Sequence, residues 1–375
     1  MKSTKPFLLF ISVVFALSSC NNKINSQSTA SSSLKNAYNG DFYIGTALHI
    51  NQIEEKDPKV SNLISKEFNS ITPENIMKSM FLQPEENKFE FDVSDKYVAF
   101  GQKHKMFIHG HTLVWHSQLA PWMSKIKDSA SMANMLTNHI TTVVKRYKGK
   151  IDSWDVVNEA LNEDGTLRKS VFLKTYGKDF ITHAFKTAAA IDSKVELYYN
   201  DYNLCNAKKR QGAVELVKNL QKNGVKIDGV GEQGHWHLDT PTLEEIEKTI
   251  LDFSALGVKV AFSELDISVL PSPYGLQGAE ISQRFANNEK MNPYPKTLPD
   301  SMQIKLAQRY NDIFKLFLKH KDKISRVTFW GVNDTQSWIN DFPIRGRTDY
   351  PLLFDREFKP KEAYNSLMKL KEGKK

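Results

Sequence analysis

The chain has 375 residues, 40% of them hydrophobic and 11% aromatic, so it can bury a large core and is not a disordered protein. Its formal charge is +8 at pH 7, but Lys and Arg are spread along the sequence, which argues against a nucleic-acid partner. Length alone allows one large domain or two of ordinary size.

The first twenty residues are typical of an export signal. Two lysines precede an apolar stretch from Phe7 to Leu17, which is too short to span a bilayer and has the length of a signal-peptide core. The sequence Leu-Ser-Ser-Cys that follows resembles the bacterial lipobox, in which the cysteine, here Cys20, becomes the lipidated first residue of the mature protein. We therefore predict a lipoprotein-type signal peptide at residues 1–19 and an exported protein held by lipid on the bacterial cell envelope, in the periplasm or at the outer surface. Ordinary signal cleavage beside an incidental cysteine is the alternative.

The next stretch is rich in Ser, Asn and Gln, and we interpret residues 20–37 as a flexible tether between membrane and domain. If Cys20 carries a lipid, Cys205 is the only other cysteine, so an internal disulfide cannot form and packing must stabilise the chain. No linker composition recurs after Tyr38. We predict a single domain over residues 38–375, acting as a monomer.

Beyond the tether, short apolar runs alternate with longer amphipathic ones. The apolar runs predict eight strands, at residues 42–47, 70–72, 107–110, 153–157, 196–199, 229–232, 260–263 and 326–330. Helical periodicity follows each, at residues 60–68, 93–104, 132–147, 172–191, 207–223, 243–256, 302–319 and 361–370. A strand followed by a helix, eight times over, predicts an α/β fold of the (β/α)8 TIM-barrel type.

Polar side chains follow every predicted strand, where a barrel of this type builds its active site. In chain order they are His49; Glu74 and Asn75; His109 and His111; Asn158 and Glu159; Asn200 and Asp201; Gln233 and His235; Glu264 and Asp266; Asn333 and Asp334. Each alone is more simply a helix cap or a turn residue. Their coincidence at all the strand ends indicates a functional site.

Two of these residues are glutamates on opposite sides of the predicted barrel. Glu159 follows the fourth strand and Glu264 the seventh, so their carboxylates can converge across the mouth. Glycoside hydrolases use a pair of carboxyl groups in an open cleft. One donates a proton to the leaving oxygen, and the other attacks the anomeric carbon or activates water.

Eight stretches carry a resemblance to a known family. In chain order they are TPENIMK (72–78), GHTLVWHSQ (110–118), WDVVNEA (154–160), YYNDYN (198–203), GEQGHW (231–236), SELDI (263–267), FWGVNDTQSW (329–338) and PLLFD (351–355). With them the chain resembles the family 10 glycoside hydrolases, endo-β-1,4-xylanases of the (β/α)8 type, over nearly all of residues 38–370. The resemblance implies endo-hydrolysis of β-1,4-xylosidic linkages in xylan by a retaining double displacement, with no cofactor and no metal.

The same resemblance assigns chemical roles. It makes Glu159 the general acid/base and Glu264 the nucleophile, which His235 hydrogen-bonds while Asp266 holds that histidine. It also implies that Asn158 grips the 2-hydroxyl of the sugar in the reactive subsite. The acid needs a raised pKa and the nucleophile has to stay ionised.

Neutral xylan offers no charge, so binding has to come from hydroxyl hydrogen bonds and from sugar faces lying on aromatic rings. The resemblance implies that Glu74, Asn75 and Lys78 bind the second glycone sugar and that His111, Trp115 and Gln233 line the reactive subsite. It also implies that Trp330 and Trp338 cover the glycone sugars. Tyr202 is implied as the aromatic platform on the aglycone side. Residues 268–299 form a connection too long to be ordinary and are expected to border the cleft.

Two positions depart from the family's usual pattern. Asn333 stands where many relatives carry Thr or Ser, and Glu232 stands where a small or apolar residue is common. We expect Glu232 to point either into the barrel wall or toward a decorated substrate.

Three other functions fit parts of the sequence. A metal-dependent barrel hydrolase would use His109 and His111, or His235 and His237, as zinc ligands, but it would leave both glutamates without a role. A sugar-binding lipoprotein without catalysis would have no need of a proton donor. A β-1,4-glucanase is the competing enzyme, and a bulky Trp338 over the glycone subsites would exclude the exocyclic CH2OH of glucose.

Overall fold

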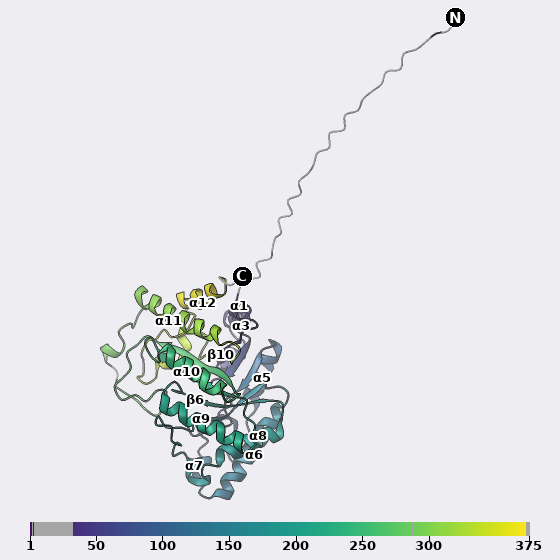
Figure 1. Cartoon of the computed structure of the whole chain (residues 1–375), viewed down its shortest axis with the longest axis vertical. Helices are drawn as coiled ribbons and strands as arrows, with labels where there is room; N and C mark the ends of the chain where they lie inside the picture. The colour runs from purple at the N-terminus through teal and green to yellow at the C-terminus, as the bar shows by residue number, and fades with distance from the viewer. Residues whose placement is uncertain (2, 4–32, 287, 373–375) are drawn as a thin grey trace. The chain divides into compact units, whose positions relative to one another are not determined.

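The computed structural model describes Met1, Ser3, residues 33–286 and residues 288–372. Residues Ser33–Lys375 form one compact unit (Figure 1). The predicted signal peptide, Cys20 and the tether up to residue 32 lie outside the described residues, apart from the isolated Met1 and Ser3.

The core of the unit is a closed ring of parallel strands. Eight of them follow one another around the ring as β1, β2, β3, β5, β6, β7, β9 and β10, and β10 pairs again with β1. Their bounds are β1 Tyr43–Leu48, β2 Ser70–Pro73, β3 Phe107–Gly110, β5 Ser153–Asn158, β6 Glu196–Asp201, β7 Gly229–Glu232, β9 Lys259–Ser268 and β10 Ile324–Phe329. This ring confirms the predicted (β/α)8 barrel. Two short strands, β4 (Val114–Trp115) and β8 (His235–His237), pair with the C-terminal parts of β5 and β9.

Helices cover the outside of the ring, as Figure 1 shows for α9, α10 and α11. The longer ones are α3 Pro58–Glu67, α5 Asp92–Lys103, α6 Ser129–Tyr147, α7 Val171–Tyr176, α8 Phe180–Ile191, α9 Ala207–Lys222, α10 Leu243–Ser254, α11 Asp300–Lys319 and α12 Glu362–Glu372. The short ones are α1 Leu34–Ala37, α2 Ile50–Ile53, α4 Ser79–Leu82 and the 3-10 turns η1 Met123–Lys125, η2 Glu289–Met291, η3 Asp334–Gln336 and η4 Trp338–Asn340. In the described part of the chain, no helix is both long and apolar enough to cross a membrane.

Local sequence explains where the helices begin. The side chain of Asp128 accepts a hydrogen bond from the backbone N–H of Ser131 and caps α6, and Thr242 and Glu245 form a reciprocal capping box at α10. The stretch 172–191, predicted as one helix, is two. Gly177 ends α7 with a φ of 86°, a left-handed backbone that glycine adopts without steric cost.

The folded unit also begins earlier than predicted. Residues 33–37 were assigned to the tether, but Leu34 is fully buried and its backbone N–H donates to Glu67 Oε2 at 3.0 Å. The hydroxyl of Tyr364 donates to the same carboxylate oxygen at 3.0 Å. The residues around Leu34 are polar, so no pattern in the sequence indicated these contacts. Through Glu67 they connect the first residues of the described domain with Tyr364 near its C-terminal end.

The barrel interior fixes the backbone that carries the site. Trp154, predicted as a core residue, is 1% exposed and lies against Gly110, where an added Cβ would come within 2.2 Å of the indole ring. Deeper in the ring, Arg326 Nη2 donates to His109 Nε2 at 3.1 Å. Burial of this histidine lowers its pKa to about 4, with the arginine charge acting in the same direction.

Candidate active site

A cavity of about 110 Å³ opens at the C-terminal ends of the strands. Every predicted site residue of the folded domain lines it except Asp266 and Tyr202. The lining side chains are Glu74, Asn75, Lys78, His111, Trp115, Gln118, Asn158, Glu159, Gln233, His235, Glu264, Ala279, Ile281, Trp330 and Trp338. The barrel thus brings together residues that lie up to 264 positions apart in the chain, from Glu74 to Trp338.

Glu159 follows the last residue of β5 and is 6% exposed. Its Oε2 accepts a hydrogen bond from the Trp115 indole at 2.8 Å, and its Oε1 accepts one from Gln233 Nε2 at 3.0 Å. Burial raises the pKa of this carboxyl, and the negative charge of Glu264 adds to the effect. The hydrogen bonds from Trp115 and Gln233 lower the pKa of Glu159, but by less than burial and Glu264 raise it.

The backbone at Glu159 is strained. Its φ of 55° lies in the left-handed region, which a residue with a long side chain rarely adopts. The backbone N–H of Glu159 donates to the carbonyl of Asn200 on the neighbouring strand at 2.8 Å, which holds this conformation. Strain of this kind persists where the surrounding structure over-determines the geometry, and it clusters at active sites.

Glu264 lies within β9 and is 5% exposed. Its Oε1 accepts a hydrogen bond from Asn200 Nδ2 at 2.8 Å, and its Oε2 lies 3.3 Å from His235 Nε2. Burial by itself would raise the pKa of this carboxyl. The hydrogen bond from His235 and the charges of His111 and His235 outweigh burial, so the net shift of the pKa is downward.

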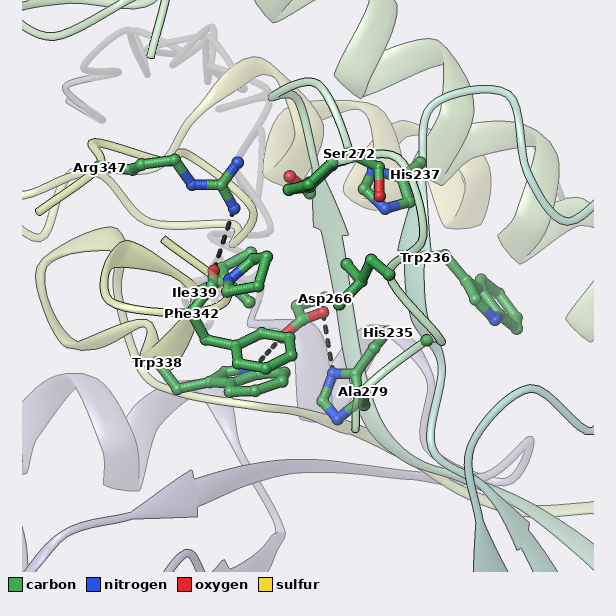
Figure 2. A pocket seen from close by; sticks show the side chains of 15 residues that line it. His235, Trp236, His237, Asp266, Ser272, Ala279, Trp338, Ile339, Phe342 and Arg347 are labelled. Atoms are coloured by element: carbon green, nitrogen blue, oxygen red, sulfur yellow. Dashed lines mark hydrogen bonds and ion pairs between the residues drawn. The ribbon is translucent and has the colours of Figure 1, made fainter. Parts of the chain in front are cut away.

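The side chain of His235 is held from behind by Asp266, as Figure 2 shows. His235 Nδ1 lies 3.0 Å from Asp266 Oδ1, and the Trp338 indole donates to the other oxygen of Asp266 at 2.8 Å. Burial opposes protonation of the imidazole, but Asp266 and Glu264 together raise its pKa to about 10. His235 is therefore a cation near neutral pH, and it stabilises the ionised form of Glu264.

Asn200 connects the surroundings of the two glutamates, and it is absent from the residues predicted for the site. Its Nδ2 donates to Asn158 Oδ1 at 2.9 Å as well as to Glu264, and its Oδ1 accepts from Ser263 Oγ at 2.5 Å. Asn158, predicted to bind sugar, is thereby held next to both carboxylates. In the sequence, Asn200 was one of the polar residues that follow predicted strands. That position was the signal that could have identified it as a site residue.

The polar residues predicted for the second glycone sugar form one cluster. Lys78 Nζ donates to Asn75 Oδ1 at 2.9 Å and to Gln118 Oε1 at 2.7 Å, and it lies 4.7 Å from the centroid of the Trp115 ring. His49 Nε2 lies 2.6 Å from Glu74 Oε2. Gln118 was not predicted as a site residue, although it ends the stretch GHTLVWHSQ. Asn75, Lys78 and Gln118 present amide and ammonium groups suited to sugar hydroxyls.

Tyr202, predicted as the aromatic platform on the aglycone side, is covered in this structure. It is 2% exposed, its hydroxyl accepts a hydrogen bond from Arg168 Nη2 at 2.8 Å, and Lys209 Nζ lies 3.5 Å from its ring centroid. Gly278, in the connection 268–299, passes so near that an added Cβ would lie 2.9 Å from the Tyr202 ring. The connection, Arg168 and Lys209 together cover the ring.

The connection 268–299 borders the cavity. Ala279 and Ile281 line it, and Glu280 forms an ion pair with Arg168, whose Nε donates to the Glu159 carbonyl at 3.1 Å. The expectation that these residues border the cleft is confirmed, although the sequence could not name which of them make contact.

The two departures from the family pattern lie outside the cavity. Glu232 is 1% exposed and accepts hydrogen bonds from the backbone N–H groups of Leu204 and Gly234 at 2.6 and 3.2 Å. It therefore points into the barrel wall, where burial raises its pKa to about 7. Asn333 is fully buried and donates to the carbonyl of Asp355 at 3.2 Å.

The side chains of His109 and His111 are engaged in hydrogen bonds. His109 Nδ1 lies 2.6 Å from Ser153 Oγ, and His111 Nδ1 lies 2.9 Å from Asp155 Oδ2. Within residues 33–286 and 288–372, no three His, Cys, Asp or Glu side chains are grouped as a metal site would require.

Comparison with known proteins gives a consistent result. The sequence profile described as Glycosyl hydrolase family 10 matches residues 33–370. An endo-1,4-beta-xylanase A from Xylanibacter ruminicola is 45% identical over 88% of this chain and 91% of its own length. An endo-1,4-beta-xylanase from Geobacillus stearothermophilus is 38% identical over 88% of this chain and 96% of its own.

Solved structures agree. A GH10 endoxylanase retrieved from a sugarcane soil metagenome superimposes with a TM-score of 0.88 and 47% identity, covering 90% of this chain and 100% of that one. A mutant enzyme in complex with xylotriose gives a TM-score of 0.81 and 33% identity, with 90% and 99% coverage. With a barrel of this architecture, two buried glutamates at its mouth and a family match over nearly the whole folded unit, the chain belongs to glycosyl hydrolase family 10.

Proposed function

We propose that this protein is an endo-β-1,4-xylanase that hydrolyses xylan with retention of configuration. The observation that carries the proposal is the pair of buried carboxyls at one cavity, whose pKa values are shifted in opposite directions by named neighbours. Opposite shifts divide the roles, because one group must enter the reaction protonated and the other ionised. The similar proteins described as endo-1,4-beta-xylanases support the choice of substrate.

Both steps of the reaction use the same two residues. The Glu264 carboxylate attacks the anomeric carbon while Glu159 donates its proton to the leaving oxygen, and a covalent glycosyl-enzyme forms. The ionised Glu159 then takes a proton from water, which attacks the anomeric carbon and releases Glu264. Asn158, held by Asn200 beside both carboxylates, is placed to bind the 2-hydroxyl of the reacting sugar.

The Trp338 ring at the cavity favours xylose over glucose. Trp338 is held by Asp266 and stacks on Phe342 with a centroid distance of 4.5 Å, so its ring cannot swing away without breaking both contacts. A glucose unit carries an exocyclic CH2OH that such a fixed ring would meet, whereas xylose carries none.

The experiment is a digestion of plain xylan and of a soluble β-1,4-glucan, followed by NMR of the first products. We expect release of reducing ends from xylan at least about tenfold faster than from the glucan, since one misfitting group costs roughly 1–3 kcal/mol. New reducing ends should be β-configured. Early α-configured ends would contradict retention, and an equal rate on glucan would contradict the substrate assignment.

We further propose that the protein is exported and lipid-anchored to the cell envelope through Cys20. The lipobox-like sequence supports this proposal, because thioether lipidation requires a cysteine at that position. Expressed in a bacterium, the full chain should partition into the detergent phase of Triton X-114, and Cys20→Ser should move it to the aqueous phase. Cys205→Ala, which changes a buried cysteine of the folded domain, is the matched control and should remain in the detergent phase. Aqueous partition of the unaltered chain would contradict anchoring.

A further inference from the structure

The face of the barrel opposite the catalytic cavity carries many lysines. The connections that lead from a helix into the next strand lie at this face, because the ring strands are parallel and the cavity lies at their C-terminal ends. We call it the N-terminal face. Its lysines, in these connections or directly beside them, are Lys105, Lys148, Lys150, Lys194, Lys222, Lys226, Lys259, Lys321 and Lys323. They are spread along the sequence, but the ring of strands gathers them at one face, in successive connections from the one before β3 to the one before β10.

Several acidic side chains of the N-terminal face are turned toward the backbone. Asp152 Oδ2 accepts a hydrogen bond from the backbone N–H of Ile108 at 2.7 Å, and Asp228 Oδ2 accepts one from Leu197 at 2.8 Å. Asp192 is buried and also accepts hydrogen bonds from backbone N–H groups. Because these carboxylates bind the starts of strands and the adjoining turns, the lysines dominate the charge that this face presents to solvent.

The lysines themselves fall into two groups. Ion pairs with carboxylates are formed by Lys226, Lys259, Lys321 and Lys323. Within residues 33–286 and 288–372, no ion pair is formed by Lys105, Lys150, Lys194 or Lys222, and all of these are exposed. We call these last residues the four open lysines. Exposed ammonium groups without a counter-ion attract an anionic partner, and at 0.1 M salt the attraction falls off within about 10 Å. The partner therefore has to lie directly against the face.

The folded unit begins at this same face. Ser33 precedes α1, and the backbone N–H of Leu34 donates to Glu67, the last residue of α3, at 3.0 Å. Asp41, in the connection from α1 to β1, pairs with Lys321 at 2.6 Å. The point where the chain enters the fold is thus joined to the lysines of the N-terminal face.

The position of Cys20 decides which anionic partner can reach the face. Residues 21–32 separate Cys20 from the folded unit, and a fully extended chain of that length spans at most about 45 Å. A lipid on Cys20 would therefore keep the N-terminal face close to the membrane surface. Anionic lipid headgroups at such a surface attract the lysines that come near them.

We propose that the N-terminal face docks on an anionic lipid surface, with the four open lysines as its contacts. The inference rests on the proposed lipid anchoring through Cys20 and extends it. The lipid holds the chain on the membrane, and the lysines set the orientation of the barrel. With this face on the membrane, the catalytic cavity opens on the opposite side, away from the bilayer and toward the polysaccharide.

The test is a lysine footprint of the lipidated full chain in vesicles. The protein is reconstituted in vesicles of phosphatidylcholine alone or of phosphatidylcholine mixed with phosphatidylglycerol. A brief acetylation followed by mass spectrometry gives the reaction rate of each lysine. We expect the four open lysines to react about fivefold more slowly on the phosphatidylglycerol vesicles than on the neutral ones. At about 1 M salt the Debye length is only about 3 Å, so the protection should disappear.

Matched control lysines are present in the same molecules. Lys125, Lys169, Lys178 and Lys296 are exposed, form no ion pair within the described part of the chain, and lie in segments that follow strands rather than precede them. Their acetylation rates should be the same on both kinds of vesicle. Equal rates for the open lysines on both kinds of vesicle, or equal protection of the open and the control lysines, would overturn the docking.

A variant gives a second readout at a residue that is left unchanged. Lys259, at the start of β9, should also be protected on phosphatidylglycerol vesicles in the unaltered chain. It should lose that protection in the combined variant Lys105→Gln, Lys150→Gln, Lys194→Gln and Lys222→Gln. It should keep it when the control lysines are replaced instead, by Lys125→Gln, Lys169→Gln, Lys178→Gln and Lys296→Gln.

The outcomes separate this inference from the anchoring on which it rests. Protection of Lys259 that survives removal of the four open lysines would overturn their role as the contacts. If the unaltered chain sedimented with neither kind of vesicle, the proposed anchoring itself would fail, which is a separate outcome.

Discussion

Replacing Glu264 by alanine should abolish hydrolysis of xylan and of activated aryl xylosides alike. Without the carboxylate no covalent glycosyl-enzyme can form, and we expect kcat to fall on the order of 10⁵-fold or more, as when other covalent nucleophiles are removed. The loss should not depend on the leaving group, because the missing group acts on the sugar carbon. Initial rates on xylan and on a dinitrophenyl xylobioside measure it.

Azide supplies a sharper readout for the same variant. A small anion can occupy the space of the lost carboxylate and attack the anomeric carbon from the same face, which would restore turnover and give an α-xylosyl azide. Glu232→Gln is the matched control, since Glu232 is a buried carboxyl that accepts backbone hydrogen bonds in the barrel wall and does not line the cavity. It should retain activity within about tenfold of the wild type. Wild-type turnover in Glu264→Ala would remove Glu264 as the nucleophile.

Replacing Glu159 by alanine should give the second largest effect, and here the leaving group decides its size. On xylan, whose leaving sugar needs a proton, we expect a loss of about 10² to 10⁴, the usual contribution of general acid catalysis. On a dinitrophenyl xylobioside, whose leaving group departs without a proton, formation of the glycosyl-enzyme should be nearly as fast as in the wild type. Stopped-flow release of dinitrophenol measures that first step.

The pH profile gives an independent check on Glu159. Glu264 must be ionised and its lowered pKa extends activity toward acid, whereas Glu159 must be protonated and its raised pKa extends activity toward alkali. Removal of Glu159 should therefore erase the alkaline fall of kcat/KM and leave the acid limb in place. Glu163→Gln, in the same loop, is the control and should keep both limbs. An unchanged alkaline limb in Glu159→Ala would contradict its role.

Much of the architecture could be read from the sequence because it depends on local patterns. A parallel barrel repeats a short buried strand and an amphipathic helix, and both leave their period in the chain. The eight ring strands accordingly lie within a few residues of their predicted positions, and β3 and β7 match them at both ends. The errors came where one residue changed the local outcome. Gly177 divided a predicted helix, and Leu34 drew part of the predicted tether into the folded unit.

The chemistry of the site depends on contacts that no local pattern records. The sequence placed Glu159 and Glu264 at strand ends, and of the neighbours that shift their pKa values the family resemblance named a hydrogen bond for His235 alone. Those neighbours are Trp115, Gln233, Asn200 and His235, which come from three other parts of the ring: strand β4, strand β6 and the segment that follows β7. Similarly, only the folded chain covers Tyr202 with the connection 268–299.

The sequence by itself thus determined the barrel, the family and the positions of the two glutamates, since strand and helix periods and ordered motifs are properties of neighbouring residues. Only the tertiary structure decided which contacts raise the pKa of Glu159 and lower that of Glu264, and that Tyr202 is covered. The physical reason is that burial and charge act through space over a few ångströms. Ring closure sets those distances between residues far apart in the chain.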